Sequence, residues 1–402
     1  MDTLSEQPLP QVKPMPEWLL VVLLGLSGFC GAMATRIVDP MVPEISRDFA
    51  VDVTTTALLS SAFALPYAFG QPILGPLGDA FGKARVIKIC MTVMTAALLL
   101  SAAMPSFSSL FTIRIIAGLA AGGLIPLGLA MLGDRFDMER RQIAISRFLV
   151  IVLTGQIAGA ALGGFLVPLI GWRGVFLGGG ALSTLALAGI LLNLKPRANA
   201  PRGRFDLGEA FARYGTIFAN PRAKVCFTAV FVEGIAIYGL HPHVAHLLEQ
   251  QGRGSAREAG IVISGMALGG ILYAAVVPIL LRLMGVYGVM ALGGLVAGAG
   301  MLIAGFDLGL PSGFVAFCVL GIGFYMLHNS LQTQASELSP TARGSAMALH
   351  AFSFFAGQAI GPAAFGHGLI SFGTQPPILL AAAVMAVLGA ATAQALRAIS
   401  LR

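Results

Sequence analysis

The sequence predicts an all-α membrane protein with twelve transmembrane helices in two pseudosymmetric six-helix bundles. Three observations support this fold class. Of the 402 residues, 56% are apolar and only 11% are charged, whereas soluble domains carry about 25% charged residues. The apolar residues form twelve runs, and each is close to the roughly 20 residues that a helix needs to cross a bilayer. The second half of the chain also repeats the first after about 202 residues.

The twelve predicted spans follow one another with short connectors, which make neighbouring helices antiparallel. A cytosolic tail (1–17) precedes an N-terminal bundle over 18–194. A cytosolic linker with an amphipathic helix (195–223) leads to a C-terminal bundle over 224–396 and a short cytosolic tail (397–402). The predicted spans are 18–38, 55–76, 86–104, 107–132, 143–169, 174–194, 224–247, 258–281, 286–306, 311–334, 344–370 and 375–396.

The basic residues predict the orientation of the spans. If both termini are cytosolic, nineteen Lys and Arg residues lie on the cytosolic side and five on the outer side, as the positive-inside rule requires. The net charge of +7 is spread over these short loops, so we expect no nucleic-acid partner. The four cysteines lie within apolar runs, and no disulfide framework is expected.

An internal repeat relates the two halves. A shift of 202 residues places Pro40 on Pro242 and Gly159 on Gly361, and a shift of 203 places Gly82 on Gly285. Two bundles of like topology follow from a repeat of this length. In secondary transporters, such halves enclose a site near the membrane midplane and move around it.

The loop after the second span carries a polar motif with charges at fixed spacing. Its residues Gly75, Asp79, Gly82, Lys83 and Arg85 stand in the stretch GPLGDAFGKAR. This stretch resembles the G-x-L-x-D-x-x-G-[RK]-x-R signature between helices two and three of the major facilitator superfamily. The resemblance implies a gating motif, in which the aspartate pairs with a helix N-terminus or an arginine.

The fourth predicted span contains Arg114 followed by Gly118 and Gly122, each four residues apart and hence on one helix face. The pattern is similar to the fourth helix of the same superfamily. An arginine within the bilayer is costly unless it is paired or hydrated, and such residues are usually functional. We expect the two glycines to pack against a neighbouring helix.

The fifth predicted span contains Gly155 and Gly159, and it resembles the G-x-x-x-G-P-x-x-G-G motif of proton-coupled drug antiporters. Ala160 stands where that motif has proline, whereas the eleventh span carries Gly361 followed by Pro362. The resemblance favours antiport. Helix packing by small residues is the alternative reading of these glycines.

Two acidic residues are candidates for proton coupling. Asp39 ends the first span on the same side as Arg114, and its carboxyl could bind a proton that it releases when Arg114 approaches. Arg36 could itself neutralise Asp39. Glu233 lies near the middle of the seventh span, where an unpaired carboxyl is expected to hold a proton.

Polar side chains in the other spans could line a substrate cavity. His241 also belongs to an H-x-H-x-x-H pattern that could bind zinc, although no metal is expected. The candidate cavity residues are Gln156, His328, Asn329, Gln332, Gln358 and His241.

Taken with these motifs, the resemblance implies a bacterial inner-membrane transporter that moves a small organic solute by alternating access. We expect proton-coupled efflux of a drug-like, sugar or metabolite substrate by a monomer in the lipid bilayer, without a cofactor beyond the proton gradient. The chain has no G-x-x-x-x-G-K-[ST] stretch for ATP. Proton-coupled uptake is the first alternative, and a membrane-embedded metalloenzyme or metal exporter using the span-seven histidines is the second.

Overall fold

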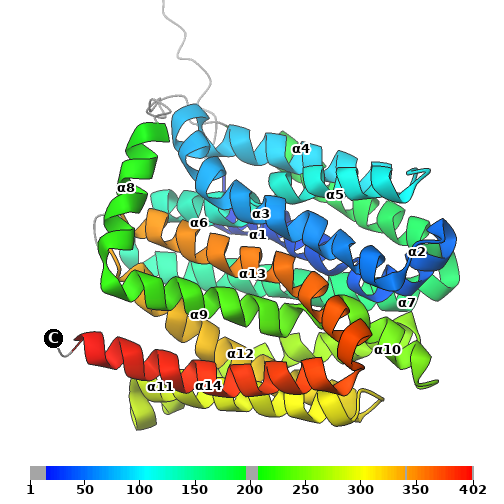
Figure 1. The fold of residues 1–402 in the computed structure, drawn as a ribbon. Helices are drawn as coiled ribbons and strands as arrows, with labels where there is room; N and C mark the ends of the chain where they lie inside the picture. The colour runs from blue at the N-terminus through cyan, green and yellow to red at the C-terminus, as the bar shows by residue number, and fades with distance from the viewer. Residues whose placement is uncertain (1–14, 196–206, 340–341, 401–402) are drawn as a thin grey trace, which may run out of the picture.

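The computed structural model describes residues 15–195, 207–339 and 342–400, which form α-helices and short 3-10 turns without a β-strand (Figure 1). The first half contains α1 (Glu17–Arg36), η1 (Asp39–Met41), α2 (Val42–Phe49), α3 (Val53–Phe81), α4 (Lys83–Ser101), α5 (Phe107–Ala121), α6 (Leu124–Arg135) and α7 (Met138–Asn193). The second half contains α8 (Leu207–Ala219), α9 (Pro221–Tyr238), η2 (His241–His243), α10 (Val244–Gln250), α11 (Ala256–Phe306), α12 (Ser312–Ser336), α13 (Arg343–Phe372) and α14 (Gln375–Ser400).

Glycines divide the two longest helices into two spans each. Gly171 in α7 and Gly285 in α11 have φ angles of 68° and 65° with extended ψ, a conformation that other residues rarely adopt. Over the described residues, nine helical stretches are long and apolar enough to cross a membrane. With α7 and α11 counted as two spans each, and with the more polar α13, all twelve predicted spans are present as helices.

The span predicted at 18–38 corresponds to α1, and the chain continues beyond it through η1 and α2, because Pro40 cannot donate a helical hydrogen bond. Two other predicted spans are interrupted. The span predicted at 224–247 is divided into α9 and α10 by η2, which contains Pro242. The span predicted at 107–132 is divided into α5 and α6 at Gly122 and Gly123. Glycine has a low helix propensity, which favours a break at this point.

The backbone preserves the predicted repeat. The turns η1 and η2 begin 202 residues apart, and each leads into a short helix. Gly171 and Gly373 are separated by the same interval, and both have positive φ (68° and 81°). Ala50 and Gly252 are a further pair at this interval, with φ angles of 51° and 64°.

Each half has its own hydrophobic core, one formed mainly by α1–α7 and the other mainly by α9–α14. The halves meet where α3 packs on α13 and α7 packs on α11. At one end of the molecule lies α8 (Figure 1), where the Tyr214 hydroxyl donates to the carbonyl of Pro72 in α3 at 3.1 Å. Residues 1–14, 196–206 and 401–402 lie outside the described residues, so the predicted tails and linker boundaries stay predictions.

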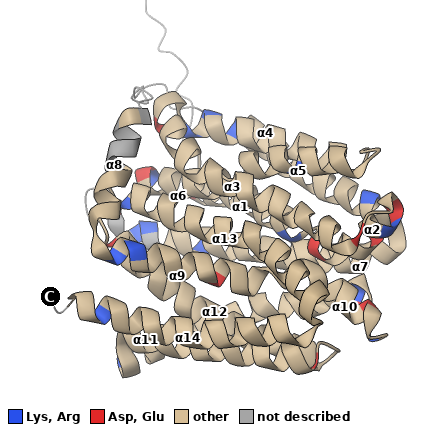
Figure 2. Cartoon of the chain, viewed as in Figure 1, with Lys and Arg blue, Asp and Glu red and all other residues tan. Residues whose placement is uncertain are grey.

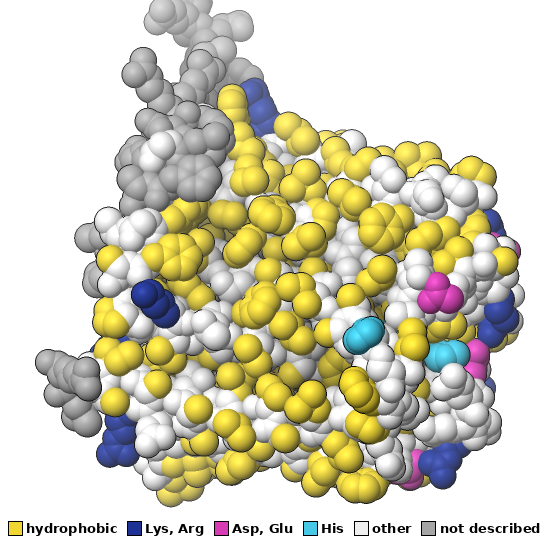
Figure 3. Space-filling model, viewed as in Figure 1, with side chains coloured by type: hydrophobic (Ala, Val, Ile, Leu, Met, Phe, Trp, Pro, Cys, Tyr) yellow, Lys and Arg dark blue, Asp and Glu magenta, His cyan; other side chains and the backbone are white. Residues whose placement is uncertain are grey.

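The surface is divided into apolar sides and charged ends. Charged residues lie mostly toward the two ends of the helices (Figure 2), and apolar side chains cover much of the face between them (Figure 3). Leu169 and Leu192, for example, are each 76% exposed. Such a surface is unfavourable in water and suits lipid. We call the end with α2 and α10 the α2 end and the opposite one the α8 end.

Candidate functional site

Arg36, the last residue of α1, connects the two halves within the protein interior. It is 7% exposed, and its Nη1 lies 3.5 Å from Oδ2 of Asp39. Its Nη2 donates to Oε1 of Gln358 in α13. The guanidinium also lies 4.0 Å from the ring centroid of Tyr238 in α9. One side chain of the first half therefore contacts two helices of the second half.

Arg114 and Asp39 lie in the same buried region without a hydrogen bond between them in the described residues. Arg114 donates from Nη1 to the carbonyl of Ala34 at 2.9 Å, and its guanidinium lies 4.4 Å from the ring centroid of Phe63. The Asp39 carboxylate accepts a hydrogen bond of 2.7 Å from Ser60. Asp39 thus contacts Arg36, the alternative partner, rather than Arg114. We call Arg36, Asp39, Ser60, Arg114 and Gln358 the arginine cluster.

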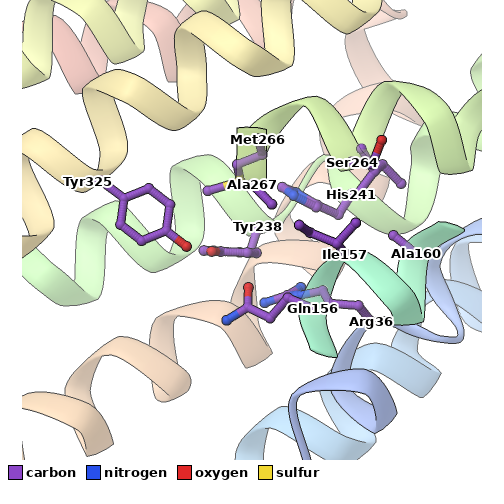
Figure 4. A pocket seen from close by; sticks show the side chains of 11 residues that line it. Arg36, Gln156, Ile157, Ala160, Tyr238, His241, Ser264, Met266, Ala267 and Tyr325 are labelled. Atoms are coloured by element: carbon purple, nitrogen blue, oxygen red, sulfur yellow. The ribbon is translucent and has the colours of Figure 1, made fainter. Parts of the chain in front are cut away.

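A small cavity lies beside Arg36 between the two halves (Figure 4). Its accessible volume is about 20 Å³, enough for about one water molecule. Arg36 and Gln156 come from the first half, whereas Tyr238, His241 and Tyr325 come from the second. Apolar side chains complete the lining: Ile157, Ala160, Ile263, Met266 and Ala267, with Ser264 among them.

Glu233 forms a second buried polar group with two histidines. Its side chain is fully buried, and Oε2 lies 2.7 Å from Nδ1 of His328 in α12. The other oxygen, Oε1, has no hydrogen-bond partner among the described residues. The ring of His328 lies 5.2 Å from that of His350 in α13. No Lys or Arg in the described chain forms an ion pair with Glu233.

The predicted cavity residues occupy different environments. Gln156 and His241 line the cavity, and Gln358 bonds to Arg36. Asn329 is half-buried and Gln332 is exposed, and neither lines the cavity.

The span-seven histidines bond to backbone carbonyls. Nδ1 of His241 lies 3.1 Å from the carbonyl oxygen of Ile237, and Nε2 of His243 lies 3.0 Å from that of Pro362. No group of three His, Cys, Asp or Glu side chains in the described chain could hold a metal ion. Two of the three histidines of this pattern thus bond to the backbone.

The residues of the predicted gating motif lie at the α8 end, where three helices meet. Nζ of Lys83 is 2.7 Å from Oδ2 of Asp134 in α6 and 3.4 Å from Oδ1 of Asp79 in α3. Gly82 has a φ of 92° and separates α3 from α4. Gly75 has open space where a Cβ would stand, and Arg85 is exposed. Lys83 is thus the residue through which the motif joins α3, α4 and α6.

The predicted packing glycines lie where backbones approach closely. A Cβ at any of them would meet a backbone atom of a neighbouring helix at less than the usual contact distance. The pairs are Gly118 with Phe63, Gly122 with Tyr67, Gly155 with Phe29, Gly159 with Met33 and Gly361 with Gly239. Pro362 follows Gly361 in α13, and its carbonyl oxygen lies 3.0 Å from Nε2 of His243.

Sequence reasoning missed several residues of these polar groups. Tyr238, Tyr325 and His350 each stand alone in an apolar run, and Ser60 is followed there by Ser61. No spacing marks these four residues as functional. The contact of Arg36 with Asp39 is among the sequence predictions, whereas its contacts with Gln358 and Tyr238 depend on how the halves pack.

The comparisons with known proteins agree with this architecture. A family model described as Major Facilitator Superfamily matches residues 24–362. The chain is 24% identical over 252 residues to the uncharacterized MFS-type transporter YwfA of Bacillus subtilis (strain 168), covering 62% of this chain and 61% of YwfA. It is 25% identical over 180 residues to the probable multidrug resistance protein EmrY of Escherichia coli (strain K12), covering 45% of this chain and 35% of EmrY. These alignments span less than two thirds of each relative.

Two solved structures share the fold over nearly the whole chain. A variant of the nucleoside transporter NupG has a TM-score of 0.75 at 16% identity, covering 94% of this chain and 99% of NupG. The human organic anion transporter MFSD10 has a TM-score of 0.71 at 17% identity, covering 95% of this chain and all of MFSD10. The predicted fold is thus confirmed. The chain belongs to the major facilitator superfamily, a family of membrane transporters rather than enzymes.

Proposed function

We propose that the protein is a secondary active transporter that exports a small organic solute in exchange for protons. It works as a monomer in the bacterial inner membrane, with the α8 end and both termini in the cytosol. Its partners are the solute, protons and the lipid bilayer, and it uses no cofactor beyond the proton gradient. The similarity to EmrY and to the multidrug export protein EmrB of Haemophilus influenzae supports the direction.

Contacts between the halves support alternating access. At the α2 end, Nη1 of Arg47 lies 2.9 Å from Oε2 of Glu249. Nearby, a Cβ at Gly164 in α7 would lie 2.6 Å from the carbonyl oxygen of Ala256 in α11. The halves therefore touch at this end, and the cavity has no room for an organic solute. Solute binding requires the halves to move apart.

The proposal of proton coupling rests on the buried carboxyl of Glu233. Within the bilayer, an ionised carboxylate without a cation is costly. Glu233 and His328 therefore retain one proton between them while the site is closed, either as a neutral hydrogen-bonded pair or as an ion pair. When the halves separate and water enters, the carboxylate is hydrated and the proton can leave.

The test measures proton release in everted membrane vesicles from cells that express the chain. The vesicles are acidified inside, and the internal pH is followed with a fluorescent dye while drugs, sugars, nucleosides and organic acids are added. An exporter discharges the pH gradient and accumulates the solute inside the vesicles. In vesicles loaded with the solute beforehand, loss of the solute together with protons would instead indicate uptake in the cell. If no compound discharges the gradient, proton coupling is wrong.

We predict that Glu233→Gln abolishes proton-driven accumulation but leaves exchange of labelled for unlabelled solute, because the amide cannot release a proton. The matched control is Glu337→Gln, which alters an exposed residue paired with Arg343. This control should transport normally. Full gradient-driven accumulation by Glu233→Gln would exclude Glu233 as the proton site.

A further inference from the structure

We infer that the cavity beside Arg36 binds the carboxylate of a lipophilic monocarboxylate, with Arg36 as its anchor. This inference rests on the proposed transport function and names the chemical class of its solute. It depends on three features of the described residues: the charge balance of the arginine cluster, the donors that face the cavity, and its apolar lining.

The arginine cluster contains two cations and one anion. Arg36 and Arg114 are 7% and 0% exposed, and Asp39 is fully buried. Asp39 is the one acidic member of the cluster, so a single positive charge remains within it. A buried charge is costly without a counter-ion. A bound monoanion would balance the cluster, whereas a dianion would reverse its charge.

Arg36 also retains an unused donor. Its side chain is 8% exposed, and its Nε has no hydrogen-bond partner among the described residues. Its distance to Asp39, 3.5 Å, is long for a charged hydrogen bond. A guanidinium fork matches the two oxygens of a carboxylate. Arg36 can therefore donate stronger hydrogen bonds to a bound carboxylate than the one that it donates to Asp39.

The remaining polar groups around the cavity are suited to the same ligand. Gln156, Tyr238 and Tyr325 can each donate a hydrogen bond, and no Asp or Glu lines the cavity. An organic cation would find no carboxylate here. The aliphatic lining next to these donors, with Ile157 and Ile263 as its larger members, suits a hydrocarbon body rather than a sugar.

Thermal unfolding of the purified protein tests the charge of the ligand. The probes are 1-naphthoate, 4-phenylbutyrate and octanoate, each compared with its own carboxamide. Phenyl phosphate serves as a dianion and tetraphenylphosphonium as a cation. We expect at least one monocarboxylate to raise the Tm as its concentration increases, and its carboxamide to have little effect. Equal stabilisation by the amides, preference for the cation or dianion, or no response to any carboxylate would overturn the inference.

Substitution of Arg36 tests the anchor. Arg36→Gln should weaken carboxylate binding by about tenfold or more. Arg36→Lys should weaken it less, because it keeps the charge but loses the fork. The matched control is Arg173→Gln, which alters a half-buried residue paired with Asp48 within the first half. If Arg36→Gln does not fold, Arg36→Lys and Tyr325→Phe provide the test. Unchanged binding in the folded Arg36 variants would refute the anchor.

The two proposals fail differently. Carboxylate binding without any discharge of the pH gradient would refute proton coupling and keep the inference. Proton-driven transport of neutral or cationic solutes, with no response to carboxylates, would refute the inference and keep the proposed function.

Discussion

The glycine at position 118 allows two helices to touch. Its missing Cβ leaves room for the backbone of Phe63 in α3, and the Arg114 guanidinium packs on the ring of the same phenylalanine. Without a hydrophobic driving force between helices in lipid, close packing of this kind contributes much of the association energy. Gly118 therefore supports the position of Arg114 as well as the α3–α5 contact.

We predict that Gly118→Ala lowers the stability of the protein by about 1–3 kcal/mol, because the added methyl group would overlap the Phe63 carbonyl. Gly133→Ala is the control. A Cβ at Gly133 meets nothing within 4 Å, and alanine favours a helix, so this variant should be neutral or slightly more stable. Thermal unfolding of the two variants in one detergent compares them. Equal unfolding temperatures would show that the Gly118 contact is not tight.

Residue type alone did not predict which polar side chains face the site. Gln358 and Gln332 are the same residue type in neighbouring predicted spans, yet Gln358 is buried against Arg36 and Gln332 is exposed. Glu233 was identified because its depth in the span can be counted from Lys224. Its partner His328 and the nearby His350 belong to two other helices, and their approach depends on packing that no sequence spacing records.

At the scale of elements, the helices followed from hydropathy and their ends from local chemistry. Asp52 begins α3 by accepting a hydrogen bond of 2.8 Å from the amide of Thr55. Hydrogen bonds from Thr55 lower the pKa of the Asp52 carboxyl, because they favour its charged form. The end of α1 lies close to the predicted end of its span, whereas the breaks after α5 and α9 lie inside predicted spans. The apolar pattern continues through both breaks, and the short glycine and proline signals do not outweigh it.

The end of α2 carries backbone strain that its counterpart avoids. Ala50 adopts the left-handed conformation with a φ of 51°, and the equivalent residue of the second half is Gly252. Ala50→Gly should stabilise the protein by about 1 kcal/mol, and Gly252→Ala should destabilise it by a similar amount. Thermal unfolding of both variants tests the pair. A fall in Tm for Ala50→Gly would show that the extra freedom of the unfolded chain outweighs the relieved strain.

At the scale of the molecule, the repeat predicted two like bundles but not how they meet. The cross-half ion pair between Arg47 and Glu249 joins residues 202 positions apart, the same interval as the repeat. Equivalent short helices of the two halves therefore face each other at the α2 end. The charges of these two residues are opposite, so no similarity between the repeats could have revealed the contact.

We predict that joining Arg47→Cys to Glu249→Cys with a short thiol crosslinker stops transport, because the α2 end can no longer open. Asp48→Cys with Arg173→Cys is the control, since that ion pair lies within the first half. The chain without these substitutions is treated with the same crosslinker, and it shows any effect of the four native cysteines. Discharge of the pH gradient in vesicles is measured after mass spectrometry has established complete crosslinking. Undiminished transport by the Arg47–Glu249 crosslinked protein would mean that this end need not move.

The position of Arg36 has a pharmacological consequence. Its guanidinium belongs to the first half, and its neighbours Gln358 and Tyr238 belong to the second. A molecule that bound tightly to Arg36 and to these neighbours at once would prevent the two bundles from separating. If Arg36 anchors the transported solute, such a molecule would occupy the same place and yet arrest the carrier. Inhibitors could therefore be obtained by enlarging a substrate until it bridges both halves.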